Sequence, residues 1–377
     1  MSVLLSALAQ TGRAVDRSFN VVRRRLGLWS RVRVVLYGGY GRPGCVRLRG
    51  RVLGGQSAEP RSGAPVWSTV WRTARRFVTD DVPGARVEVT VGDVIVEATS
   101  DVDGYFEAAL EVEVCPSSLW RSATARVLDP ASDDDAHAYV QVPTADAQFV
   151  VVSDLDDTVL EAEAPHALRL AWRVLSSSAE TRRTLPGVRT LYRALVTDDG
   201  QPVNPLVYVS DSPWDLYEHL TGALEHHGIP RGALHLRDLN ENPMSWLDPD
   251  AHAHKLSAIG DVLDTYPDLD AVLIGDSGQK DPEVYQQIVA RHAGRVRAVL
   301  IRHVAGPRRE REVCQIARDV EMRGTAMRVF SDSAEGARAV VELGLASERA
   351  VGLLQRSSWR PPRTSPFRPS APRGRSA

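Results

Sequence analysis

Four apolar runs from residue 148 onward, the first three followed directly by polar residues, constrain the fold more than any other feature of this sequence. Helical periodicity separates the runs, which lie at 148–152, 206–209, 271–274 and 296–301. A continuous apolar strand suits a parallel sheet that is covered on both faces. Strands that alternate with helices predict an α/β domain built on such a sheet. Functional groups of these sheets lie beyond the carboxyl ends of the strands, so the residues after each run are the candidates for chemistry.

Acids and hydroxyls follow the first three runs. The sequence SDLDDT follows the first run at 153–158, Ser210 and Asp211 follow the second, and GDSGQKD follows the third at 275–281. Lys255 stands ahead of the third run. A single DxD is weak evidence, but four such elements in this order at one edge of a sheet indicate a functional site.

These residue types suit metal-assisted phosphoryl transfer. A strand-end aspartate such as Asp154 can attack phosphorus and form an acyl-phosphate that water later hydrolyses. A second carboxyl two residues on, Asp156, can protonate the leaving oxygen and then activate the water. Because carboxylate and phosphate repel each other, a hard cation is needed between them, and oxygen ligands suit Mg²⁺. Asp276 and Asp281 would supply the remaining carboxylates, although Asp281 could instead serve only as a helix N-cap.

The lysines of the chain are unusually few. Of 46 basic residues only Lys255 and Lys280 are lysines, and both lie at or within these motifs. A lysine supplies a compact point charge that the planar fork of arginine does not reproduce. We expect Lys255 to neutralise the phosphoryl charge as it builds, and the hydroxyl of Ser210 to hold a phosphoryl oxygen. Ser210 could instead be only a turn residue at the strand end, and for Lys280 we expect proximity alone.

The motifs resemble those of the haloacid dehalogenase-like phosphohydrolase superfamily. Its four motifs have counterparts here at Asp154, Asp156 and Thr158, at Ser210, at Lys255, and at the pair Asp276 and Asp281. The resemblance implies that Asp154 is the nucleophile and Asp156 the general acid and base. It also implies Mg²⁺ bound by Asp154, the backbone carbonyl of Asp156 and Asp276, with Asp281 helping directly or through water.

A closer resemblance is to the catalytic domain of the actin-patch-protein type of phosphatidate phosphatases. It rests on DLDDTV, YVSDSPWDLYEHL, the His254–Lys255 pair and LIGDSGQKDPEVY, and it covers roughly residues 35–305. It implies Mg²⁺-dependent removal of phosphate from phosphatidic acid to give diacylglycerol. The sequence departs from the family pattern at Asp211, where Asn or Ser is expected, and in the Pro- and Trp-containing segment 241–252. We expect His254 beside the site, and Trp214 in the core rather than in contact with lipid.

The remaining regions are distinguished by composition. Short alternating runs with turn signals predict a β-sandwich-like domain, in which the DVDG sequence at 101–104 reads as a turn rather than a calcium site. The predicted fold class is α/β: a Rossmann-like, haloacid dehalogenase-type parallel sheet with a small helical cap formed by residues 161–200, preceded by the β-sandwich-like domain. The predicted divisions are a basic amphipathic helix at 1–33, a β-rich sandwich-like domain at 34–148, a phosphohydrolase catalytic domain at 149–305, a C-terminal α/β extension at 306–355 and a disordered basic tail at 356–377.

Composition excludes several classes of protein. A chain of 377 residues that is 43% hydrophobic and 25% charged has ordinary globular composition. Three widely separated cysteines favour neither a disulfide framework nor a zinc cluster. No apolar run approaches the length of about 20 residues that spans a bilayer, and the N-terminus is a poor secretory signal. We expect a cytoplasmic protein, soluble or peripheral at the membrane.

The leading expectation for function is hydrolysis of phosphatidic acid by Mg²⁺-dependent chemistry. The basic helix either docks on its own domain or lies on an anionic membrane surface, which is then a candidate partner; no nucleic acid partner is expected. Two alternatives remain open. One is the same chemistry on another, soluble phosphate ester, and the other is a non-catalytic module that binds a lipid or a protein partner.

Overall fold

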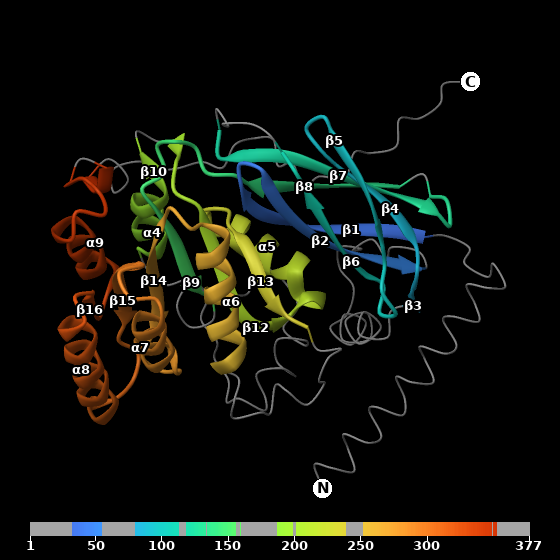
Figure 1. Ribbon diagram of the computed structural model, residues 1–377. Coiled ribbons are helices and arrows are strands. Elements are labelled where there is room, and N and C mark those ends of the chain that lie inside the picture. The colour runs from blue at the N-terminus through green and yellow to red at the C-terminus, as the bar shows by residue number, and fades with distance from the viewer. Residues whose placement is uncertain are drawn as a thin grey trace, which may run out of the picture.

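Two β-sheets, of eight and six strands, form the framework of the molecule (Figure 1). The computed structural model describes residues 32–54, 80–112, 118–132, 134–155, 159, 187–198, 201–238, 252–348 and 350–352. The predicted basic helix, apart from its last two residues, and the predicted basic tail lie outside these ranges. Among the described helices, none combines the length and the apolar character needed to cross a membrane.

The eight-stranded sheet is almost entirely antiparallel and nearly closed. Its order is β3-β2-β1-β8-β7-β4-β5, with β6 also paired to β2. Its one parallel pairing, between β1 and β8, is short and joins the two halves of the sheet. Its strands are β1 (Val32–Arg42), β2 (Cys45–Gly54), β3 (Asp80–Asp81), β4 (Arg86–Val91), β5 (Val94–Thr99), β6 (Tyr105–Leu110), β7 (Trp120–Asp129) and β8 (Asp135–Gln141).

Alternating side chains build the core of this sheet. In β4, Val87, Val89 and Val91 are buried while the residues between them are more exposed, as the two-residue period of a strand requires. Side chains from both halves of the sheet join one core cluster. This region is rich in β-structure, as expected, but its strands form one nearly closed hydrogen-bonded sheet and not the two packed sheets of a sandwich.

Two details of the sequence prediction are tested in this region. The predicted helix at 1–33 is wrong at its end, because β1 begins at Val32, where Val32, Val34 and Leu36 alternate inward onto the core. The DVDG sequence is a turn, as expected. The Oδ1 atom of Asp101 accepts hydrogen bonds from the backbone of Asp103 and Tyr105, at 2.9 Å each.

The six-stranded sheet is parallel throughout. Its strands are β9 (Phe149–Asp154), β12 (Leu206–Pro213), β13 (Ala233–Arg237), β14 (Asp270–Asp276), β15 (Val296–Arg302) and β16 (Ala326–Phe330). They lie in the order β13-β12-β9-β14-β15-β16. Counted along the chain this is 3-2-1-4-5-6, the doubly wound order, whose switch point falls between the first and fourth strands. Ligands of such sheets bind outside the carboxyl ends at that point, which here lies between β9 and β14.

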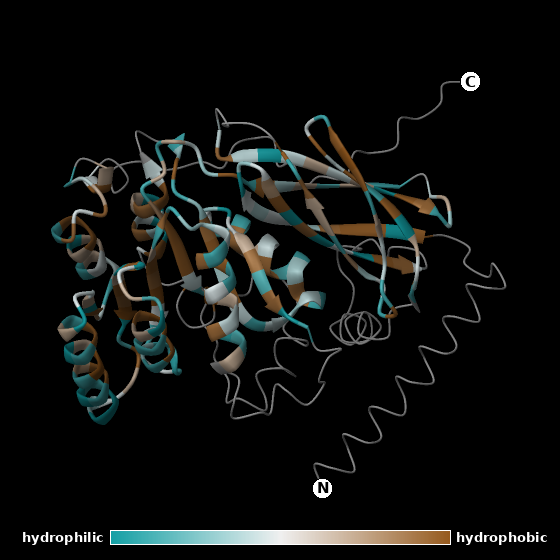
Figure 2. Ribbon diagram, viewed as in Figure 1, coloured by the Kyte–Doolittle hydropathy of each residue, from teal (hydrophilic) through white to brown (hydrophobic). Residues whose placement is uncertain are grey.

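Helices cover both faces of this sheet because its strands carry apolar side chains on both sides; Figure 2 shows these strands as a hydrophobic layer between helices of mixed character. One face is covered by α4 (Val188–Val196), α5 (Tyr217–His226) and α9 (Ser333–Glu342), with the short helix η2 (Trp214–Leu216) leading into α5. The other face is covered by α6 (His252–Thr265), α7 (Asp281–Arg291) and α8 (Pro307–Met322). A small hairpin of β10 (Thr197–Asp198) and β11 (Gln201–Pro202) follows α4.

Part of the predicted cap belongs to the helical layer instead. Helix α4 buries Leu191, Tyr192 and Leu195 in the core, and the Tyr192 ring stacks on Tyr208 of β12. The cap prediction is therefore wrong for residues 188–196, since their apolar face packs on the sheet; residues 160–186 lie outside the described structure. The region predicted as a C-terminal extension supplies the edge strand β16 to the same sheet.

The two sheets share a packed interface. The Tyr37 ring of β1 stacks on Trp214 at 4.8 Å and also contacts Tyr217, so Trp214 is a core residue, as the sequence suggested. At the same interface the buried Arg51 of β2 binds Asp215 at 2.6 Å and Asp81 at 2.8 Å. The eight-stranded sheet thus packs directly on the segment that follows β12.

Candidate active site

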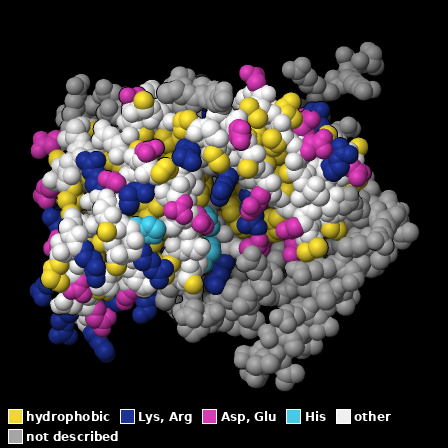
Figure 3. Space-filling view, viewed as in Figure 1, with side chains coloured by type: hydrophobic (Ala, Val, Ile, Leu, Met, Phe, Trp, Pro, Cys, Tyr) yellow, Lys and Arg dark blue, Asp and Glu magenta, His cyan; other side chains and the backbone are white. Residues whose placement is uncertain are grey.

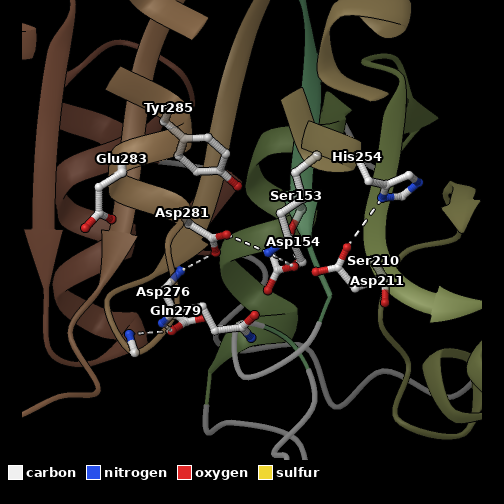
Figure 4. A network of polar contacts seen from close by, with 12 residues as sticks. Ser153, Asp154, Ser210, Asp211, His254, Asp276, Gln279, Asp281, Glu283 and Tyr285 are labelled. Atoms are coloured by element: carbon white, nitrogen blue, oxygen red, sulfur yellow. Dashed lines mark hydrogen bonds and ion pairs between the residues drawn. The ribbon is translucent and has the colours of Figure 1, made fainter. Parts of the chain in front are cut away.

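Three aspartates meet at the switch point of the parallel sheet. Asp154 ends β9, Asp276 ends β14, and Asp281 begins α7. Strands β9 and β14 pair in register, with Ser153 opposite Ile274, so their carboxyl ends are level. All three aspartates are buried, and one carboxylate oxygen from each lies within 4.8 Å of the others (Figure 4). The structure therefore brings these three predicted site residues together.

Lys255 of α6 lies between two of these carboxylates. Its Nζ atom is 2.8 Å from Oδ1 of Asp154 and 2.6 Å from Oδ1 of Asp281, and the side chain is buried. Burial alone would lower the pKa of the ammonium group, but the charges of Asp154 and Asp281 outweigh it and hold the pKa well above its ordinary value. The lysine therefore stays charged and offsets part of the repulsion among the acids.

The loop between β14 and α7 fixes the last two aspartates. Oδ1 of Asp276 accepts hydrogen bonds from the backbone of Gly278 at 2.6 Å and of Gln279 at 3.1 Å. Oδ2 of Asp281 accepts the backbone N–H of Asp276 at 3.0 Å. The N-cap position of α7 is Lys280, so Asp281 does not serve as a helix N-cap, and its carboxylate faces the cluster instead.

Ser210 reaches the same edge from the neighbouring strand. Val209 of β12 pairs in register with Asp154, and Ser210 follows it, fully buried. Its Oγ atom accepts the backbone N–H of Ser212 at 3.0 Å. Because β12 continues to Pro213, Ser210 lies within the strand and not in a turn after it, at a position next to the nucleophile candidate.

Asp211 and His254 form a pair beside the cluster. Their Oδ1 and Nδ1 atoms lie 3.5 Å apart, and Figure 4 shows the two side chains pointing toward each other. Burial would raise the pKa of Asp211, but the interaction with His254 and the charge of Lys255 outweigh it, so the pKa is lowered. Asp211 is therefore ionised and is paired with His254. His254 lies beside the site, as expected.

Of the remaining motif residues, one faces solvent and two lie outside the part of the chain that the structure describes. The side chain of Lys280 is 58% exposed and lies 3.8 Å from Glu283, so it is not part of the cluster. Asp156 and Thr158 lie outside the described residues. Two hydroxyl groups that the sequence prediction missed hold the strands in place. The Ser153 hydroxyl donates to the backbone carbonyl of Asp154 and is hydrogen-bonded to the Tyr192 hydroxyl. The Tyr285 hydroxyl donates to the backbone carbonyl of Ile274 at 2.7 Å. Ser153 was detectable as a polar residue that ends an apolar run.

The donor set fits a hard divalent cation. It consists of three buried carboxylates whose oxygens converge, with one ammonium group that cancels a single negative charge. Oxygen donors with a net negative charge are what Mg²⁺ binds in proteins. Asp154, Asp276 and Asp281 are the described residues that would hold it.

Fold and site together define an α/β protein with a buried acidic centre at the carboxyl edge of a parallel sheet. Within it, residues 149–303 match the family described as "Phosphatidate phosphatase APP1, catalytic domain". The match runs from β9 to the end of β15 and includes Asp154, Ser210, Lys255, Asp276 and Asp281. The match covers less than half of the chain, and over this segment it confirms the resemblance to phosphatidate phosphatase catalytic domains seen in the sequence.

Two curated relatives share part of the chain. An uncharacterized protein of Schizosaccharomyces pombe is 28% identical over 214 residues, which are 54% of this chain and 34% of that protein. Phosphatidate phosphatase APP1 of Saccharomyces cerevisiae is 26% identical over 152 residues, which are 40% of this chain and 25% of that protein. The matched part of the chain therefore spans about a third or less of the length of these relatives.

Similarity to solved structures is weak. A carbohydrate acetylesterase from Xanthomonas citri aligns with 84% of this chain and 74% of its own at 9% identity, with a TM-score of 0.33. A similarity of this size bears on neither fold nor function.

Proposed function

We propose that this protein is a Mg²⁺-dependent phosphatase that works through an aspartyl-phosphate and hydrolyses phosphatidic acid to diacylglycerol and phosphate. The observation that carries the proposal is the placement of Lys255 against Asp154 and Asp281 in a buried cluster completed by Asp276. Support for the substrate comes from the family match of residues 149–303 and from the name of the yeast relative. Placement in the haloacid dehalogenase-like superfamily is part of the same proposal.

The chain's residues account for each bond that changes. A carboxylate oxygen of Asp154 attacks phosphorus while the bond from phosphorus to the glycerol oxygen breaks, and Asp156 gives that oxygen its proton. Diacylglycerol leaves, and the phosphoryl group remains on Asp154. Water then attacks phosphorus, Asp156 takes a proton from it, and the bond to Asp154 breaks. Phosphate leaves and both carboxyl groups return to their starting states.

The residues around Asp154 govern charge. Lys255 offsets the negative charge that builds on the phosphoryl oxygens, and its buried position strengthens that effect because little water screens it. Ser210 holds a phosphoryl oxygen from the neighbouring strand. The three aspartates would hold Mg²⁺, whose charge would screen the repulsion between carboxylate and phosphate.

A vesicle assay tests the proposal on the full chain. Phosphate release is measured from phosphatidic acid in phosphatidylcholine vesicles and from a panel of soluble phosphomonoesters, each with Mg²⁺ and with a chelator. We expect Mg²⁺-dependent release from the vesicles. Turnover of a soluble ester without turnover of the lipid would leave a phosphatase but remove the lipid substrate, and hydrolysis of nothing in the panel would favour a binding module.

Two matched Asp→Asn variants test the nucleophile. Asp154→Asn should lower turnover by about 10⁴-fold or more, as loss of a nucleophile does. Asp270→Asn is the control, because Asp270 begins β14 at the opposite edge of the sheet, with a side chain that is 49% exposed. Hydrolysis that survives Asp154→Asn unchanged would rule out an aspartyl-phosphate at this position.

A further inference from the structure

One arginine of α8 turns inward while its neighbours face solvent. Figure 3 shows Lys and Arg side chains gathered over the corner of the molecule that α8 occupies in Figure 1. Arg308 is typical of them: its side chain is 91% exposed, and its Nε atom lies 3.6 Å from Glu312. The side chain of Arg309 is only 18% exposed. Both residues lie beyond the matched family segment, which ends at His303.

Arg309 binds the loop that carries the last acidic pair of the site. Its Nε atom donates to the carbonyl of Ser277 at 2.9 Å, and its Nη2 atom donates to the carbonyl of Gln279 at 2.8 Å. The N–H groups of Gly278 and Gln279, in the same loop, hold the carboxylate of Asp276. Arg309 therefore binds backbone carbonyl groups of this loop, while backbone N–H groups of the same loop bind the carboxylate of Asp276.

The same guanidinium group also binds a residue in the first turn of α7. Its Nη1 and Nη2 atoms pair with the two carboxylate oxygens of Glu283 at 2.6 and 2.7 Å, a bidentate arrangement. A weaker bond reaches Glu312 on its own helix at 3.3 Å. Glu283 stands two residues after Asp281, so one side chain ties together both ends of the segment from Asp276 to Asp281. Only the planar fork of arginine can make these bonds together.

We propose that Arg309 is a positioning residue for the metal site: by fixing the loop at 277–279 and the start of α7, it holds Asp276 and Asp281 in the geometry that binds Mg²⁺. This inference rests on the proposed function. It places a determinant of metal affinity on α8, outside the segment that matches the phosphatase family. Groups that orient metal ligands typically contribute about 10- to 100-fold to metal affinity.

Metal binding by the full chain tests the inference without relying on activity. The dissociation constant for Mg²⁺ is measured by isothermal titration calorimetry, and Mn²⁺ binding by electron paramagnetic resonance, for the native chain and for Arg309→Gln. We expect Arg309→Gln to weaken binding by about 10- to 100-fold. Arg308→Gln is the matched control from the next position, and it should bind both ions as the native chain does.

Two further variants keep the test decisive if Arg309→Gln folds poorly. Arg309→Lys keeps the charge but not the fork, so it should recover little of the lost affinity. Glu283→Gln removes one charge of the bidentate pair and leaves the two carbonyl bonds, so its affinity should be intermediate. Each variant is first compared with the native chain by circular dichroism and thermal unfolding without metal.

The outcomes are distinguishable. Native-like Mg²⁺ affinity in Arg309→Gln or Arg309→Lys, even with a lower unfolding temperature, would show that Arg309 only stabilises the fold and would overturn the inference alone. A native chain that binds neither ion would overturn the metal dependence of the proposed function and this inference with it.

Discussion

At the scale of single residues, the acidic cluster leaves no room for a side chain at Gly275, the residue before the end of β14. A Cβ atom added to Gly275 would lie 2.5 Å from Oδ2 of Asp281 and 2.7 Å from its Cβ atom. Real Cβ contacts are never so short, so the carboxylate sits where it does only because the residue before Asp276 is glycine. The sequence shows this glycine, but the reason for it lies in the close approach of another element.

The first prediction uses this glycine. Gly275→Ala should displace Asp281 and lower turnover by about 100-fold, the cost of shifting a reacting group by about 1 Å. Gly260→Ala is the control: Gly260 lies within α6 and a Cβ atom there would meet nothing within 4 Å. It should leave turnover unchanged and raise the free energy of unfolding by about 0.5–1 kcal/mol, because alanine favours a helix over glycine. Phosphate release and urea unfolding measure the two effects.

The second prediction compares the two lysines. Lys255→Arg should lower turnover by about 10²–10³-fold, because a guanidinium group cannot replace a buried point charge that touches two carboxylates. Lys280→Arg should be fully active, since Lys280 faces solvent. An active Lys255→Arg enzyme would make the scarcity of lysine in this chain a matter of codon usage alone.

The raised pKa of Lys255 gives a third prediction, on pH. A folded-state pKa above the ordinary value of about 10.4 means that the stabilisation from the charged lysine is fully present below that value and is lost only as the pH rises through the higher folded-state pKa. Titration of Lys255 therefore contributes no fall in stability between pH 6 and 9. The native chain and a Lys255→Arg variant, which keeps a cation beside Asp154 and Asp281, should therefore differ in free energy of unfolding by a constant amount over that range, as measured by urea unfolding.

At the scale of secondary-structure elements, the sequence predicts what local patterns determine. The apolar strand at 149–152 and the acids that follow it were identifiable because burial on both faces leaves an uninterrupted apolar run. The cap prediction fails for helix α4, because an amphipathic pattern shows that a face is buried but not against which surface. Arg309 was missed for a similar reason, since nothing local distinguishes it from Arg308.

The contact between α8 and α7 yields a fourth prediction. Burial raises the pKa of Glu283, but the hydrogen bonds from Arg309 outweigh it, so the pKa lies below its ordinary value. A lowered pKa contributes stability above the unfolded-state value, about 4.5, that is lost as the pH falls through the folded-state pKa. The free-energy difference between the native chain and Glu283→Gln should therefore be constant from pH 6 to 8 and should shrink below pH 4.5. A difference that does not vary with pH in urea unfolding would mean that the pair adds no charge-dependent stability.

At the scale of the whole molecule, the two sheets are coupled by buried contacts. Tyr37 and Tyr105 of the eight-stranded sheet belong to the same core cluster as Trp214 and Tyr217. Arg51 lies over the Tyr105 ring at 4.5 Å while it binds carboxylates on both sides of the interface. The interface therefore combines apolar burial with a largely desolvated ion pair.

A fifth prediction tests this coupling. Arg51→Met should lower the free energy of unfolding by about 3–5 kcal/mol, because Asp81 and Asp215 lose a buried cation that both of them bind. The control is Arg86→Met. The Arg86 side chain is 55% exposed in a surface pair with Glu97, so its replacement should change the free energy of unfolding by about 0.5 kcal/mol or less.

Far-ultraviolet circular dichroism and tryptophan fluorescence should follow one transition in the native chain. Separate transitions would show that the sheets unfold independently.

The interface also sets an order of events during synthesis. The strands of the eight-stranded sheet are complete when residue 141 has been made, yet the surface that covers Tyr37 and Arg51 begins only at Trp214. At about 5–20 residues per second, the ribosome leaves that aromatic and basic surface uncovered for seconds. In the nascent chain, the eight-stranded sheet thus exposes this surface before the segment that covers it has been synthesised. Transiently exposed apolar surface favours aggregation and is what chaperones bind, so this interval is one in which the chain depends on that protection.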